Sequence, residues 1–473
     1  MIGPARTPRI FPGWYVVAGV FMMLLVSSGI GFYGLGVYLR ALTVEQGFSV
    51  GAVSGATALF FAVAGLTGIP VAAVIARRDA RPVIAGGALA CGVALLLLGR
   101  VEREWQAYAV YALFGAGFAA CSLVPGTTLV TRWFARRRAV ALSIATTGLS
   151  AGGVAITPFL TTLVADRGLR AVTPYLAVGF VLGVVPVTAL LLRSSPKALG
   201  LVPDGLTSEA LSTAQHRPPQ QQPSQPQPSP QPSLEPPPTP EQPSAASTAA
   251  VGSTTVATAP VPAARAPSEK SPTAAAPEGM TGRFFVCVTL AHSLAMLAQV
   301  GGIAHLVNLV AERADAALAG TAVSTLAVSS LVGRLLGGVV ASRLSMRAMA
   351  VVLMGVQGAA LALLALVDGR LALLGLTVVF GLTVGNLLML HPLLLAEHFG
   401  ALDYGRIYAR SSLMATTGIA GGALFLGVLH DALGGYGIAF SLAGLASVLG
   451  GVVLLFSGPT RVAAAAAAPV RSG

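Results

Sequence analysis

Apolar stretches recur from one end of the chain to the other, and short charged segments separate them. Each stretch is long enough to form a helix that crosses the hydrocarbon core of a bilayer, which takes about 20 residues. The stretches are continuously apolar, whereas the strands of a membrane-spanning barrel alternate apolar with polar residues. The pattern therefore predicts an all-α membrane protein.

We place twelve spans in two sets of six. They are expected at residues 14–39, 53–76, 83–98, 105–130, 140–165 and 172–192, and at 284–310, 318–341, 348–367, 371–396, 407–429 and 436–456. The segment between the sets is rich in Pro, Gln and Ser, and such a segment cannot bury enough apolar surface to fold. The expected regions are an N-terminal six-helix bundle at 1–193, a disordered cytoplasmic linker at 194–280, a C-terminal six-helix bundle at 281–460 and a cytoplasmic tail at 461–473.

The charged residues predict how the spans are oriented. Only 10% of the residues are charged, and the net charge is +12. Arg residues gather in alternate loops, such as residues 77–81 and 132–138, and this bias is typical of cytoplasmic loops. We therefore expect both termini in the cytoplasm and the chain in the inner (plasma) membrane of a bacterium. The same distribution leaves no basic surface for a nucleic acid.

Neither a metal nor a cofactor is expected. Cys91, Cys121 and Cys287 lie in apolar stretches and lack C-x-x-C spacing. The predicted spans also lack an H-E-x-x-H motif, a G-x-S-x-G motif and a pair of carboxylates. The chain is therefore not expected to be an enzyme.

Short motifs of the first half return in the second half in the same order. Ala-Thr-Thr-Gly occurs at 145–148 and again at 415–418, and a Gly-Gly pair follows each copy. The Arg residues after the second span, at positions 77 and 81, correspond to those after the eighth, at 343 and 347. Repeats in one register indicate duplicated halves, and transporters with parallel halves hold their substrate between them. Since one chain carries both halves, we expect a monomer.

The chain resembles the major facilitator superfamily over all twelve spans and both termini. The resemblance is carried by the loop Ala-Arg-Arg-Asp-Ala-Arg at 76–81 and by its counterpart at 342–347. The Arg positions of the family motif are present, and its Asp and Gly are not. The resemblance implies two pseudo-symmetric six-helix bundles, and gating loops that contain Arg77, Arg81, Arg343 and Arg347.

Within that superfamily, the chain looks like the monocarboxylate transporter and oxalate/formate antiporter group. The matching pieces are Gly-Trp-Tyr-Val-Val at 13–17, Arg-Trp-Phe-Ala-Arg-Arg-Arg-Ala-Val-Ala at 132–141 and Gly-Arg-Leu-Leu-Gly at 333–337. Members carry small organic anions and hold the carboxylate with a cation of the eighth helix, a role that falls to Arg334 here. Animal-type members have an Asp where this chain has Ser330. Oxalate exchangers use a Lys of the eleventh helix, and no Lys lies in a span here.

Arg334 also stands out without the resemblance, as the fixed charge that lies well inside a predicted span. A charge at that depth costs about 2.5–3.5 kcal/mol, so something must offset it. A guanidinium group can bind both oxygens of a carboxylate. A purely structural Arg would instead bond to carbonyls or extend to the membrane surface. Both interpretations stay open at this point.

Other polar residues in the spans are candidate ligands or proton carriers. Such residues often only join helices by hydrogen bonds, but His can exchange a proton near neutral pH. The candidate substrate ligands beside Arg334 are Tyr33, His305, Asn308, Asn386 and His391. The candidate proton carriers are His292, His305 and His391.

These features predict a secondary active transporter of small, monocarboxylate-like organic anions that works by alternating access. Its partners would be the anion and the lipid bilayer. Proton coupling, symport and antiport stay open. Two alternatives remain, since fold alone does not decide function: a drug or metabolite efflux transporter of the same superfamily, and a membrane sensor that does not transport.

Overall fold

The computed structural model describes residues 11–134, 137–196, 201, 203, 282–340 and 345–458, and this part of the chain is almost entirely helical. It contains twelve helices that are long and apolar enough to cross a membrane, which confirms the predicted number of spans. The expected tail at 461–473, nearly all of the expected linker at 194–280, and Arg343 lie outside the described residues.

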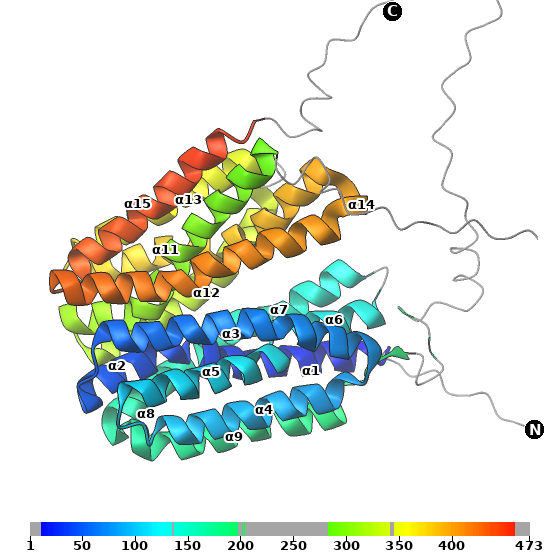
Figure 1. Ribbon diagram of the computed structural model, residues 1–473, viewed down its shortest axis with the longest axis horizontal. Coiled ribbons are helices and arrows are strands. Elements are labelled where there is room, and N and C mark those ends of the chain that lie inside the picture. The colour runs from blue at the N-terminus through cyan, green and yellow to red at the C-terminus, as the bar shows by residue number, and fades with distance from the viewer. Residues whose placement is uncertain are drawn as a thin grey trace, which may run out of the picture. The chain divides into compact units, whose positions relative to one another are not determined.

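The helices of each half lie together in Figure 1, coloured blue to teal for the first half and green to red for the second. The elements of the first half are α1 (Gly13–Val26), the π-helix η1 (Ser27–Phe32), α2 (Gly34–Gln46), α3 (Val50–Arg77), α4 (Ala80–Leu98), α5 (Glu104–Ala120), α6 (Leu123–Trp133), α7 (Arg138–Ala155), α8 (Thr157–Arg167) and α9 (Leu169–Leu190). Those of the second half are α11 (Arg283–Arg313), α12 (Ala316–Val340), α13 (Met346–Leu364), α14 (Arg370–Leu433) and α15 (Tyr436–Leu455).

The first span runs past its predicted end at residue 39, and its winding changes in the middle. α1 continues through the π-helix η1 into α2, which ends at Gln46. The N–H of Tyr33 bonds to the carbonyl of Ser28 at 2.9 Å, as a π-helix requires. Since a π turn holds an extra residue, it rotates the residues that follow and so sets the direction of Tyr33.

Two further spans of the first half are interrupted where continuous helices were predicted. α5 ends before α6, and α7 ends before α8. Pro125 and Pro158 lie in the first turn of the helices that follow these breaks. A proline has no N–H for the carbonyl four residues earlier, and its ring crowds that carbonyl, so the preceding helix ends.

The tenth and eleventh spans, Arg370–Phe399 and Arg410–Leu433, confirm the two predicted helices. The residues between them are also helical where a loop was predicted, so both spans belong to the element α14. The chain reverses direction between these two spans. In a straight helix, about 20 residues would separate His391 from Ser411 by about 30 Å. Instead, Nε2 of His391 lies only 2.7 Å from Oγ of Ser411. The two spans are therefore antiparallel, as predicted.

The repeated glycines make the same contact in both halves. In the first half they let α7 approach the backbone of α1, and in the second they let α14 approach the backbone of α11. The contacts, glycine first, are Gly148 with the carbonyl of Phe21, Gly152 with Leu25, Gly418 with Ser293 and Gly422 with Leu297. Small residues allow this close packing, which holds helices together in lipid. The sequence repeat is thus a structural repeat.

The two halves meet where α3 packs against α14, α2 against α11, and α12 against both α7 and α8. Gly36 of α2 lies against the backbone carbonyl of Ala304 in α11. Gly427 of α14 lies against Ser54 and the carbonyl of Val50 in α3. These contacts bring the polar residues of the two halves together.

Candidate functional site

Arg334 lies on α12, the helix that packs against α7 and α8 of the first half. Its side chain is half-buried. Gly153 of α7 faces both the ring of Tyr33 and Ala327, two turns before Arg334. Nε of Arg334 is buried and has no hydrogen-bond partner within the described part of the chain. The structure therefore brings two predicted ligands, Arg334 and Tyr33, to the interface between the halves. We call the part of this interface where α12 packs against α7 and α8 the seam.

Asn386 of α14 contacts the helix that carries Arg334, within the second half. Its Nδ2 donates to the carbonyl of Gly333 at 2.7 Å and to that of Leu382 at 3.2 Å. Gly385, the residue before it, lies against the aliphatic part of Arg334. Since Nδ2 of Asn386 is occupied by two carbonyls, this predicted ligand holds α14 against α12 beside the guanidinium.

His305 and Asn308 lie in a hydrogen-bonded network that joins the two halves. Nε2 of His305 is 2.9 Å from the carbonyl of Ala423 and 3.2 Å from Oγ of Ser54, which belongs to α3. Its Nδ1 is 3.0 Å from the hydroxyl of Tyr436, which also accepts from Nδ2 of Asn308 at 3.2 Å. A carbonyl only accepts, so Nε2 carries the proton and Nδ1 accepts from Tyr436. The neutral imidazole thus satisfies both ring nitrogens.

A second contact between the halves lies at the start of α3. The N–H of Gly51 donates to the carboxylate of Asp431, at the end of α14, at 2.6 Å. The helix dipole favours a carboxylate at this position. The carboxylate of Asp431 is also 3.1 Å from Nδ1 of His430, whose Nε2 is 3.6 Å from Glu312. The loops at this end are expected outside the cell. We therefore call the following residues the outer network: Gly51, Ser54, His305, Asn308, Asp431 and Tyr436.

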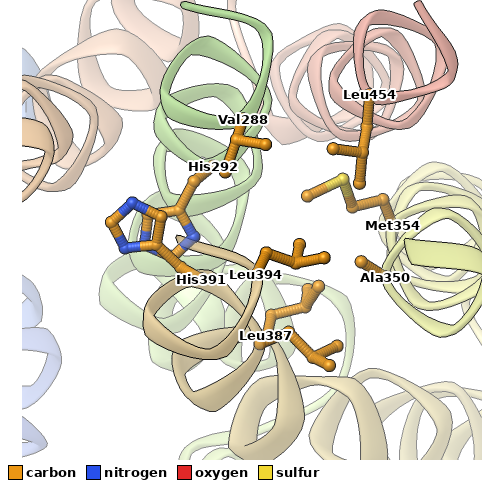
Figure 2. A pocket seen from close by; sticks show the side chains of 9 residues that line it. Val288, His292, Ala350, Met354, Leu387, His391, Leu394 and Leu454 are labelled. Carbon is orange, nitrogen blue, oxygen red and sulfur yellow. The ribbon is translucent and has the colours of Figure 1, made fainter. Parts of the chain in front are cut away.

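His292 of α11 and His391 of α14 form a stacked pair. Their ring centroids are 4.0 Å apart and their planes differ by 6°. Figure 2 shows the two rings at one edge of a pocket whose other side chains are apolar. Nε2 of His391 lies 2.7 Å from Oγ of Ser411, which is 2.7 Å from Oγ1 of Thr289. The pocket, of about 10 Å³, has room for about one water molecule and is too small for an organic substrate.

Two of the predicted gating residues, Arg81 and Arg347, make contacts within their own halves. Asp79, which caps α4, pairs with Arg81 at 2.8 Å and accepts a hydrogen bond from Ser194. Hydrogen bonds from Arg81, together with the one from Ser194, hold the pKa of the Asp79 carboxyl well below its usual range. In the second half, Arg347 donates to the carbonyl of Gly458 at 2.7 Å. Arg77 is the last residue of α3.

Several residues of these clusters were missed in the sequence patterns: Ser54, Asp79, Ser411 and Tyr436. A serine in an apolar helix ordinarily bonds to its own backbone, as Ser54 also does to Val50 at 2.6 Å. Its second contact, to another helix, leaves no trace in the local sequence. Asp79 did carry a signal, because an Asp directly before a helix is a typical N-cap.

Removing the polar contacts of the outer network is expected to loosen the outer end. Asp431→Asn removes the charge that accepts the hydrogen bond from Gly51, and Ser54→Ala removes the contact to His305. Hydrogen bonds to charged groups contribute about 1.5–3 kcal/mol to stability. Val50, at the start of α3, is 8% exposed. A cysteine introduced there, in a chain without its native cysteines, should react several-fold faster with an impermeant maleimide added outside.

The matched control for this experiment is Asp368→Asn. The carboxylate of Asp368 pairs with Arg313 at 2.7 Å, and both residues belong to the second half. This control should leave the labelling rate unchanged. Equal rates in the control and in the double variant would contradict the role of the outer network, and labelling only from the inside would overturn the predicted orientation.

The sequence profile of the Major Facilitator Superfamily matches residues 21–261, more than half of the chain. No curated protein sequence matches this chain. The solved structure of a bacterial homologue of the human lysosomal transporter Spinster, inward-facing and occupied, is similar with a TM-score of 0.61 and 13% identity. That match covers 94% of this chain and 95% of the other.

The structure of the nucleoside transporter NupG is similar with a TM-score of 0.65 and 10% identity, and the match covers 95% of this chain and 100% of NupG. At these identities the likeness shows the fold. Together with the profile match and the twelve membrane-length helices, it shows that the chain belongs to the Major Facilitator Superfamily of membrane transporters.

Proposed function

We propose that this transporter moves small organic anions, monocarboxylates in particular, and that Arg334 binds the carboxylate. The observation that carries the proposal is a half-buried guanidinium whose Nε lacks a partner in the described ranges. It lies on the helix whose Ala327 meets Gly153 together with the ring of Tyr33. A bound carboxylate would offset the cost of a charge inside a membrane helix. It would accept two hydrogen bonds from the guanidinium fork, which is the strongest way to hold a carboxylate.

Arg334 and Tyr33 belong to different halves, and this supports transport by alternating access. An anion bound by both residues would draw the halves together around it. When the outer network opens and the inner ends close, the same site would face the other side of the membrane. In this scheme His305 and Asn308 close the outer end, since both ring nitrogens of His305 have protein partners. Arg77, Arg81, Arg343 and Arg347 would serve the inner gate.

The stacked pair of His292 and His391 is our candidate for proton coupling. Two positive charges at 4.0 Å repel each other by about 4 kcal/mol at an effective dielectric constant of about 20, so the pair takes up one proton at most. The hydroxyl of Ser411 next to His391 supports such a proton, because it can donate or accept. We further propose that the chain works as a monomer in a bacterial inner membrane with both termini in the cytoplasm.

A ligand screen on the purified protein tests the anion proposal. A ligand at 100 times its dissociation constant stabilises the folded protein by about 2.7 kcal/mol. Short carboxylates are expected to raise the melting temperature in detergent, and neutral nucleosides and cationic drugs are expected to leave it unchanged. Labelled forms of the stabilising acids should then enter proteoliposomes. Stabilisation only by nucleosides or drugs would contradict an anion site and favour efflux or a different cargo.

A further inference from the structure

The seam between α12 and the pair α7–α8 has a register that two contacts define. Gly153 faces Ala327, and Thr161, further along the first half, faces Gly320, earlier on α12. Residue numbers therefore rise along α7 and α8 as they fall along α12, so the helices are antiparallel.

This register places two serines at the same level. Ser150 lies three residues before Gly153 on α7, and Ser330 lies three residues after Ala327 on α12. Residues three apart share a helix face. Counting from the contact between Gly153 and Ala327, Ser150 and Ser330 therefore lie at the same level of the seam, one from each half.

Both serine hydroxyls are buried and unsatisfied. Ser150 and Ser330 are each 1% exposed, and among the residues that the structure describes their Oγ atoms have no hydrogen-bond partner. Thr161 of α8, in contrast, donates to the carbonyl four residues earlier, whereas Oγ1 of Thr157 also lacks a partner among the described residues. A buried hydroxyl without a partner costs about 1–3 kcal/mol. Such a cost at two positions on the same level suggests that something else pairs with them.

The guanidinium group of Arg334 lies next to these hydroxyls. Ser330 is one turn before Arg334 on the same face of α12, and long side chains in helices point back toward the N-terminus. Consistent with this, Gly385 faces both Nε of Arg334 and the carbonyl of Ser330. Nε of Arg334 and the two serine hydroxyls, which have no partners in the described structure, therefore lie within about one helical turn of one another along the seam.

We propose that Ser150 and Ser330 bind a second oxygen of the substrate, next to the carboxylate held by Arg334. The site then selects carboxylates that bear a hydroxyl or oxo group on the adjacent carbon. This inference rests on the proposed carboxylate site. A serine hydroxyl both donates and accepts, so it pairs with either substituent. An analogue without that oxygen leaves both serines unpaired, and sites of this kind discriminate strongly against such analogues.

The test compares glycolate with acetate, which differ by one hydroxyl group. In proteoliposomes, Ser150→Ala and Ser330→Ala should each raise the KM for glycolate about tenfold, the loss of one hydrogen bond, and leave the KM for acetate within about twofold. The matched control is Ser329→Ala, because Ser329 packs against Gly381 of α14, within its own half. It should leave the ratio of the two KM values unchanged.

Stability without substrate provides an independent measurement. Since Ser150→Ala and Ser330→Ala remove a buried hydroxyl without a partner in the described residues, both variants should melt at or above the temperature of the wild type. A clear fall in melting temperature would show that the hydroxyls have a structural role, and would overturn the inference.

The transport result also separates this inference from the proposed function. Arg334→Gln should stop uptake of both acids. If it does, and the two serine variants keep the wild-type ratio of KM values, the serine subsite is refuted and the carboxylate site stands. If Arg334→Gln transports both acids normally, the carboxylate site itself is refuted. Uptake of acetate but not of glycolate by the wild type would also refute the subsite.

Discussion

Arg334→Gln is expected to reduce uptake of organic anions by at least about 30-fold while the protein still enters the membrane. Truncating one partner of a buried, hydrogen-bonded charge pair costs about 2–5 kcal/mol, which sets this range. Insertion should not suffer, because removing a charge makes the eighth span easier to insert. Arg334→Lys should keep weak transport, because the charge remains while the two-pronged geometry is lost. The measurement is the initial rate of uptake by proteoliposomes at matched protein density.

Arg370→Gln is the matched control for the loss of a cation. Arg370 is exposed and pairs with Asp315 near the start of α12. Its loss should leave uptake within about twofold, since surface ion pairs contribute little. If Arg334→Gln transports every tested anion as fast as the wild type does, Arg334 is not part of the site. Residual uptake that appears only at acidic pH would instead show that a protonated His compensates for it.

Gly422→Leu is expected to prevent stable folding of the second half. A side chain at this position would run into the backbone of α11, at the carbonyl of Leu297 and the N–H of Gly301. The clash is with backbone atoms, which cannot rotate away, so α14 would have to move off α11. Overpacking in a well-packed interior costs typically about 1–3 kcal/mol, and a helix displacement costs more. Size-exclusion chromatography in detergent should show little monodisperse protein.

The neighbouring glycine provides the control. A Cβ atom at Gly421 would meet no described atom within 4 Å. Gly421→Leu should therefore yield folded protein with a melting temperature close to that of the wild type. Equal yields from the Gly421 and Gly422 variants would show that the close approach of α14 to α11 does not hold this half together.

Parts of the candidate site could be predicted from individual residues. Arg334 is conspicuous because a fixed charge is rare in apolar sequence, and Tyr33 because its position is deeper than an interfacial tyrosine. Their proximity could not be predicted, since more than 300 positions separate them in the sequence. His305 illustrates the same limit: its type suggested proton transfer, whereas its partners, Ser54 and Tyr436, place it in the outer network.

The sequence by itself determined the features that depend on local composition. Twelve apolar stretches are sufficient to predict twelve spans, because each helix satisfies its own backbone in lipid regardless of its neighbours. Repeated glycines predicted the duplication, because close approach of helices requires small residues wherever it occurs. Even the breaks after α5 and α7 carried a local signal, in the form of a proline.

Only the tertiary structure decided which faces of the helices meet. In lipid, side chains that face the bilayer and side chains that face another helix are equally apolar, so hydrophobic periodicity does not indicate the register between helices. That register stacks His292 on His391 and places Nε2 of His391 next to Oγ of Ser411. Each of these contacts joins residues from different spans, and the geometry that creates them arises only when the helices pack.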